Sequence, residues 1–116
     1  MDWEEFNTAT LKTAIYPGVG QGGTPELTYL ALGLAGETGE VVDCIKKVAR
    51  VGIPVTDHEK QYIDGRKSHA AEELGDVLYY WMRLVDALGF KPEMIMQATI
   101  DKLEKRRLTG TLAIRP

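Results

Sequence analysis

The feature that most constrains this chain is a pair of acidic residues placed within an apolar helical stripe. Glu37 stands where the stripe needs another apolar side chain, and Glu40 follows one helical turn later. An ionised carboxylate on the buried side of a helix is costly unless a cation or hydrogen-bond donors compensate it. We therefore expect a partner for both carboxylates elsewhere in the chain. The apolar residues of the stripe recur in steps of three and four: Leu30, Leu34, Val41, Cys44 and Val48.

The length predicts one globular domain over residues 1–116, and we expect its core at about 24–107. Apolar residues make up 44% of the chain and charged residues 27%, as in ordinary soluble domains. The formal net charge of -3 argues against a nucleic-acid partner. The single Cys44 cannot form an internal disulfide, and it reads as a small buried hydrophobe. Because we see neither a secretory signal nor a membrane-spanning stretch, we expect a cytoplasmic protein without a membrane partner.

Periodicity and capping residues predict an all-α chain. A capping box at Thr56 and Glu59 predicts a short helical turn, and Asp64-Gly65 predicts a break after it. Residues beyond Gly110 are expected to form a loose tail. Four main helices are expected: Asp2 to about Ile15, Thr24 (as cap) to about Arg50, Ser68 to Leu88, and Pro92 to Arg107. Their expected arrangement is an antiparallel, four-helix bundle-like fold.

The third expected helix is apolar on nearly every side. Such a helix must be covered all round, which three companions in a small bundle rarely achieve, so we expect a subunit interface there. Its apolar residues include Leu74, Val77, Leu78, Tyr79, Tyr80, Trp81, Met82, Leu84 and Leu88.

A second pair of carboxylates repeats the spacing of the first. Glu73 and Asp76 lie one turn apart, as Glu37 and Glu40 do. If the two helices pack antiparallel, four carboxylates converge, and a divalent cation resolves their repulsion. All-oxygen ligation suits Mg²⁺, with Mn²⁺ as an alternative. Iron is disfavoured, because the di-iron bundles need a Glu-x-x-His pair that is absent here.

The two motifs, GETGE at 36–40 and EELGD at 72–76, resemble those of the MazG-type all-α nucleoside triphosphate pyrophosphohydrolases. The likeness extends from Leu30 to about Arg107. It implies that Glu37, Glu40, Glu73 and Asp76 bind magnesium, and that Glu37 or Glu40 acts as the base.

By the same resemblance, the enzyme cleaves a (deoxy)nucleoside triphosphate between its α and β phosphates, giving the monophosphate and pyrophosphate. The expected role is housekeeping of the nucleotide pool. Single-domain relatives form dimers or tetramers with active sites near the subunit interface. We therefore expect a homotetramer here, with a homodimer as the alternative.

Substrate contacts are expected from three basic residues and one tyrosine. Lys47, Lys102 and Arg106 would neutralise the phosphates, and Tyr80 would contact the nucleotide. Each has an ordinary alternative: helix C-terminal charge for the basic residues and a core role for Tyr80. Thr99 replaces an asparagine that the family often carries. The remaining candidates are assigned to the core or interface (Trp3, Trp81) or to the surface (His58, His69, Glu72).

Two other functions stay open at the level of sequence. One is phosphoribosyl-ATP pyrophosphohydrolase activity, which uses a related fold and related carboxylate motifs. The other is a non-catalytic helical interaction module on the same scaffold. The Gly-rich loop at 16–23 is weak evidence for phosphate binding, because it lacks the lysine of a P-loop.

Overall fold

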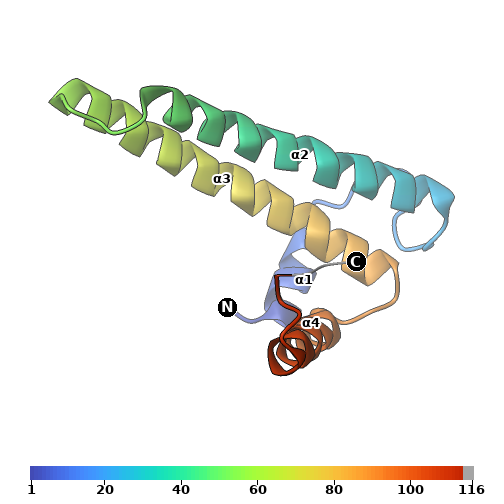
Figure 1. The fold of residues 1–116 in the computed structure, drawn as a ribbon. Coiled ribbons are helices and arrows are strands. Elements are labelled where there is room, and N and C mark those ends of the chain that lie inside the picture. The colour runs from blue at the N-terminus through green and yellow to red at the C-terminus, as the bar shows by residue number, and fades with distance from the viewer. Residues whose placement is uncertain (114–116) are drawn as a thin grey trace.

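The computed structural model describes residues 1–113 and contains four helices in that range, with no strand (Figure 1). The all-α prediction is confirmed. The predicted tail beyond Gly110 includes residues 114–116, which lie outside the described residues. No helix within 1–113 combines the length and the apolar character needed to cross a membrane. The helices are α1 (Trp3–Leu11), α2 (Thr24–Val51), α3 (Asp57–Ala87) and α4 (Pro92–Thr109).

An antiparallel hairpin of α2 and α3 forms the long axis of the molecule, with α1 and α4 gathered near the end of α3 (Figure 1). Leu30 and Met82 are fully buried, and Cys44 is 3% exposed. The radius of gyration is 18.0 Å, whereas a compact domain of this length has about 13 Å. The far half of the hairpin therefore stands out from the rest of the chain.

Helix ends follow the capping residues closely. Asp2 and Thr56 each form a capping box with the glutamate three residues later, Glu5 and Glu59. At the other ends, α2 stops at Gly52, close to its predicted end near Arg50, and α4 stops at Gly110, which adopts the left-handed conformation.

The first helix is shorter than predicted: α1 ends at Leu11 instead of near Ile15. The Tyr79 hydroxyl contacts both the hydroxyl and the carbonyl oxygen of Thr13, at 3.2 Å each, and holds that residue in a turn. The turn lets Tyr16 become buried, while Ile15 is 94% exposed.

The predicted break at Asp64-Gly65 was wrong, because α3 runs without interruption from Asp57 to Ala87. Ile63 and Ala70, on either side of the glycine, are buried in the hairpin. A helical glycine costs about 1 kcal/mol relative to alanine, which burial of one isoleucine side chain (~1.5–3 kcal/mol) offsets. Tertiary packing therefore overrides the local turn signal.

The start of α2 also differs from the prediction, because Gly23 is the N-cap and Thr24 is the first helical residue. The Glu26 side chain is buried at 3% exposure, and its carboxylate accepts hydrogen bonds from the backbone N–H groups of Gly20 (2.7 Å) and Gly22 (2.8 Å). Both glycines have positive φ, which an L side chain rarely adopts. Glu26 therefore fastens the Gly-rich loop to the start of α2.

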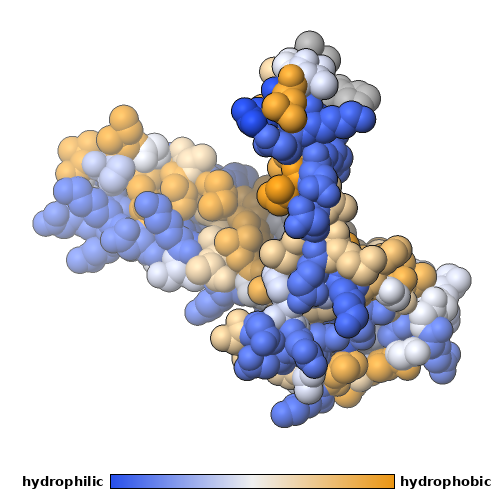
Figure 2. Space-filling model, turned by 90° about the horizontal axis from the view of Figure 1, so that it is seen from below, coloured by the Kyte–Doolittle hydropathy of each residue, from blue (hydrophilic) through white to orange (hydrophobic). Residues whose placement is uncertain are grey.

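Large apolar side chains remain exposed on α3 and α4. On α3, Leu74 is 54% exposed and Leu88 is 50% exposed, although both belong to the predicted apolar set. Figure 2 shows α4 projecting from the body with apolar atoms on its surface. In α4 only Pro92 is buried, while Met94 and Ile100 are more than half exposed.

Candidate active site

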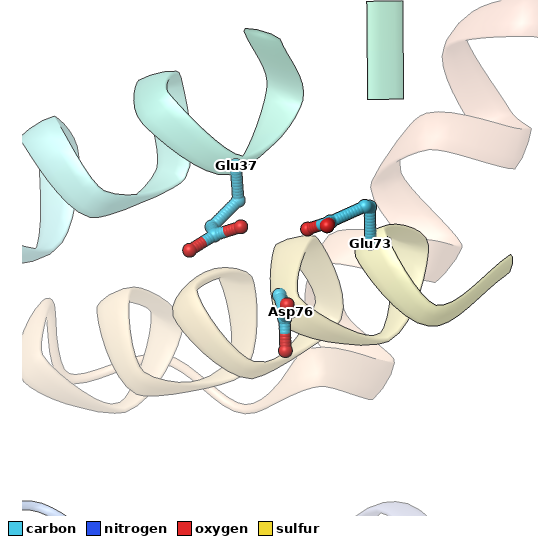
Figure 3. Close-up of side chains that lie close together, drawn as sticks. All are labelled: Glu37, Glu73 and Asp76. Carbon is cyan, nitrogen blue, oxygen red and sulfur yellow. The ribbon is translucent and has the colours of Figure 1, made fainter. Parts of the chain in front are cut away.

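Three carboxylates meet between the two long helices. Glu37 of α2 and Glu73 of α3 point toward one another, and Asp76 lies on the next turn of α3 (Figure 3). Each residue offers one oxygen, and these oxygens all lie within 4.8 Å of one another. Glu37 and Glu73 are half-buried, whereas Asp76 is exposed. The cluster is therefore set in the seam of the hairpin and opens to solvent at Asp76.

A close helix–helix contact lies one turn from this cluster. The ring of Tyr80, one turn after Asp76, lies against the backbone of Gly33, one turn before Glu37. A Cβ at Gly33 would come within 2.3 Å of the ring, so only glycine fits without a shift. Gly33 thus permits the close approach of α2 and α3 that brings Glu37 near Glu73.

Burial and mutual repulsion perturb the cluster. The pKa of Glu37 is raised by partial burial, then by the nearby carboxylates of Glu73 and Asp76 and by the charge of Glu40. The pKa of Asp76 is raised by partial burial and then by the Glu73 carboxylate. Within residues 1–113, no lysine or arginine forms an ion pair with Glu37, Glu73 or Asp76.

This donor set fits a hard divalent cation. It offers carboxylate oxygens from two helices, as Mg²⁺ and Mn²⁺ prefer, and a negative charge that a cation would neutralise. The open side at Asp76 leaves room for the water molecules that Mg²⁺ retains.

Glu40 lies outside the group of three. Its side chain is exposed on α2, yet its charge contributes to the raised pKa of Glu37. Of the four carboxylates singled out in the sequence, the structure gathers Glu37, Glu73 and Asp76 and leaves the fourth beside them.

Residues 26–109 match the MazG nucleotide pyrophosphohydrolase domain, which covers most of the chain. The chain belongs to the MazG nucleotide pyrophosphohydrolase family. It is also 32% identical over 108 residues to the Gene 37 protein of Mycobacterium phage L5, an alignment that covers 92% of this chain and 90% of the phage protein. No solved structure matches the chain significantly.

A histidine that the sequence analysis assigned to the surface contacts the MazG carboxylates. His69 Nε2 lies 3.0 Å from Glu73 Oε1, one turn away on α3. His69 is therefore not isolated as predicted, although its side chain is 43% exposed and does lie at the surface. Its spacing of four residues from Glu73 was the signal that could have revealed the contact.

The two substrate-binding candidates on the hairpin lie on either side of the cluster. Lys47 is on α2 beyond Glu40, and its Nζ forms an ion pair with Asp43 Oδ2 at 2.9 Å. Tyr80 is half-buried on α3. Its pKa is raised mainly by burial and next by the neighbouring Tyr29. The charge of Glu37 adds to that rise, so the Tyr80 hydroxyl lies in the electrostatic field of the site.

The other two substrate-binding candidates are remote from the carboxylates within one chain. Lys102 and Arg106 lie on α4, which Figure 1 shows below α3 and near α1. Lys102 is exposed and Arg106 is half-buried. The described chain therefore does not bring these two side chains to the carboxylates.

Proposed function

We propose that this MazG-family chain is a magnesium-dependent pyrophosphohydrolase that converts a (deoxy)nucleoside triphosphate to the monophosphate and pyrophosphate. Manganese is the alternative ion. The observation that supports this most is the convergence of Glu37, Glu73 and Asp76 from two helices, without a lysine or arginine partner among the described residues. A helical interaction module would gain nothing from this electrostatic cost.

In the proposed reaction, Glu37, Glu73 and Asp76 would hold the metal. Glu40, whose charge acts on Glu37 from one turn away on α2, would join them or accept a proton from water. A bound divalent cation would polarise the α-phosphoryl group and lower the pKa of the attacking water. Glu37 or Glu40 takes the proton as the water oxygen bonds to the α phosphorus. The bond to the bridging oxygen breaks, and pyrophosphate leaves with that oxygen.

Lys47, which lies on the same helix as Glu37, would approach the departing phosphates and exchange its ion pair with Asp43 for one with a phosphate. Tyr80 borders the cluster on the other side. The rival phosphoribosyl-ATP activity uses the same chemistry, and a panel of triphosphates and phosphoribosyl-ATP, scored by product, separates the two substrates.

We further propose that the chain is a homotetramer, with a homodimer as the alternative. The exposed apolar side chains of α3 and α4 favour burial against a second copy. In such an assembly, α4 of a neighbouring subunit would carry Lys102 and Arg106 to the carboxylates that they do not reach in their own chain. This arrangement would place the active site at a subunit interface.

The test of this function is a hydrolysis assay with added inorganic pyrophosphatase. Glu37→Gln and Glu40→Gln should each lower kcat by roughly 100-fold or more, the range expected when a general base is lost. The helical content should be unchanged, because each substitution removes a charge and preserves the shape. Glu4→Gln, at an exposed position in α1, is the matched control and should retain full activity. Wild-type turnover that persists in excess chelator would contradict the metal requirement.

A further inference from the structure

A cavity lies at the end of the hairpin where α2 begins and α3 ends, away from the carboxylate cluster. Its volume is about 300 Å³, and it is bounded by the Gly-rich loop and by Tyr16, Glu26, Arg83, Asp86 and Ala87. None of these residues belongs to the two MazG carboxylate motifs. The cavity therefore needs an explanation of its own.

Buried charges of both signs line this cavity. Arg83 is 1% exposed and Glu26 is 3% exposed. Arg83 Nη2 donates to the Asn7 carbonyl oxygen at 3.2 Å, and Nη1 lies 3.5 Å from Asp86 Oδ2. Arg83 Nε has no hydrogen-bond partner among the described residues, which is costly for a buried charged donor.

The charged residues that line the cavity determine which kind of ligand it can bind. Two carboxylates, Glu26 and Asp86, and one guanidinium line the cavity, so its lining carries a net negative charge that disfavours a phosphate. Arg83 offers only donors and the carboxylates offer acceptors. A neutral, polar heterocycle with an acceptor and a donor on its edge, such as a nucleobase, would bond to Arg83 through the acceptor and to a carboxylate through the donor.

The cavity is aligned with the carboxylate cluster along the hairpin. On α3, Asp76, Tyr80, Arg83 and Ala87 follow one another in steps of four, three and four, and so share one face of the helix. The seven residues from Asp76 to Arg83 span about 10 Å along the axis, a distance that an extended nucleoside monophosphate can bridge.

A row of tyrosines connects the two places. Tyr16, which lines the cavity, stacks on Tyr29 with ring centroids 5.3 Å apart and an interplanar angle of 13°. The ring centroid of Tyr29 in turn lies 6.4 Å from that of Tyr80. The charge of Glu37 contributes to the raised pKa of Tyr80. The cavity, the tyrosines and the carboxylates thus follow one another along the hairpin.

We propose that this cavity binds the base of the nucleotide whose phosphates lie at the carboxylate cluster, with Arg83 donating to the base and Asp86 accepting from it. This inference rests on the proposed function, because it takes the substrate to be a nucleotide. It assigns base recognition to residues outside the metal motifs.

Filling the cavity tests the inference. In Ala87→Leu, a larger side chain occupies the space, while the carboxylate cluster is three turns away. Ala49→Leu, an exposed position near the far end of α2, is the matched control. Binding of the common nucleoside monophosphates and of inorganic pyrophosphate is measured by calorimetry, with magnesium present and the full chain used throughout.

Ala87→Leu should weaken binding of the monophosphates at least tenfold and change pyrophosphate binding less than twofold, whereas Ala49→Leu should change neither. Wild-type affinity for the monophosphates in Ala87→Leu, or no monophosphate binding by the wild type, would overturn the inference.

If Ala87→Leu weakens the binding of both ligands, Asp86→Asn tests the pocket instead. The Asp86 side chain is 43% exposed, so this substitution should leave the packing of the fold intact. A changed ranking of the bases in Asp86→Asn supports the pocket, and an unchanged ranking overturns it. Absence of hydrolysis together with the expected binding pattern would defeat the proposed function alone. Hydrolysis without any effect of Ala87→Leu on binding would defeat the pocket alone.

Discussion

Glu37 is unusual both in the sequence pattern and in the electrostatics of the site. It was identified because a carboxylate stands in an apolar stripe, and the structure shows it half-buried opposite Glu73. Its raised pKa means that the folded, metal-free chain binds protons more tightly than the unfolded chain does. Stability is then coupled to pH through this group.

The sign of this coupling gives a prediction. For carboxyls with raised folded-state pKa values, such as Glu37 and Asp76, the free energy of unfolding falls as pH rises through those values. Carboxyls with lowered pKa values, such as Asp43 and Glu59, act in the opposite direction, so the comparison must be between variants.

In chelator, wild type should therefore lose stability relative to Glu37→Gln as pH rises from about 4 to 8. Urea unfolding at several pH values measures the difference. Adding magnesium at pH 8 should restore the stability of the wild type and have little effect on the stability of Glu37→Gln. Parallel pH profiles for the two proteins would show that the carboxylates do not repel one another.

Residues whose role depends on a distant partner were not predictable. Glu26 and Arg83 are buried and line one cavity, but they lie far apart in the sequence and on different helices. The exposed position of Glu40, too, depends on how its side chain turns from α2 and not on its spacing. The carboxylates on the seam were predictable because the apolar stripe marks which face of each helix is buried.

At the scale of the helices, boundaries with chemical caps were predicted well. Pro92 and Gly110 mark the ends of α4 where the structure has them. The capping box of Thr56 and Glu59 is also present, but it begins the whole of α3 and not the short turn that was predicted. The errors occurred where packing overrides a local signal: α3 continues through Gly65, and α1 stops early because Tyr79 holds Thr13. Both depend on contacts between elements that the sequence pattern does not specify.

The close approach of α2 and α3 at Gly33 can be tested by a single methyl group. Gly33→Ala places a Cβ against the ring of Tyr80, and overpacking of this kind costs about 1–3 kcal/mol. Alanine gains only about 0.5–1 kcal/mol over glycine in a helix, so the overpacking should dominate. Urea denaturation should therefore show a destabilised protein.

Gly36→Ala is the matched control on the same helix, because a Cβ there would meet nothing within 4 Å. It should be neutral or stabilising. If Gly33→Ala were as stable as Gly36→Ala, the proposed contact between Gly33 and the Tyr80 ring would not constrain the hairpin.

For the molecule as a whole, the exposed apolar surface predicts association. The single chain leaves Met94 and Ile100 on α4 and Val42 on α2 more than half exposed, and its hairpin stands away from the body. Burying such side chains gains about 25 cal/mol per Å², which favours a second copy.

Light scattering at micromolar concentration should therefore give the mass of a homotetramer, or of a homodimer as the alternative. Ile100→Glu should shift the population toward smaller species and lower activity together, if α4 of one subunit completes the site of another. A monodisperse wild-type monomer of full activity would contradict both the assembly and the shared site.

In the proposed reaction, water attacks the α phosphorus of a nucleoside triphosphate at the carboxylate cluster. Hydrolysis in ¹⁸O-labelled water with magnesium, followed by mass spectrometry of the first products, tests this step. We expect a nucleoside monophosphate carrying the labelled oxygen, unlabelled pyrophosphate, and no diphosphate intermediate. Nucleoside diphosphate with labelled free phosphate as the first products, or label in the pyrophosphate, would contradict the proposed reaction.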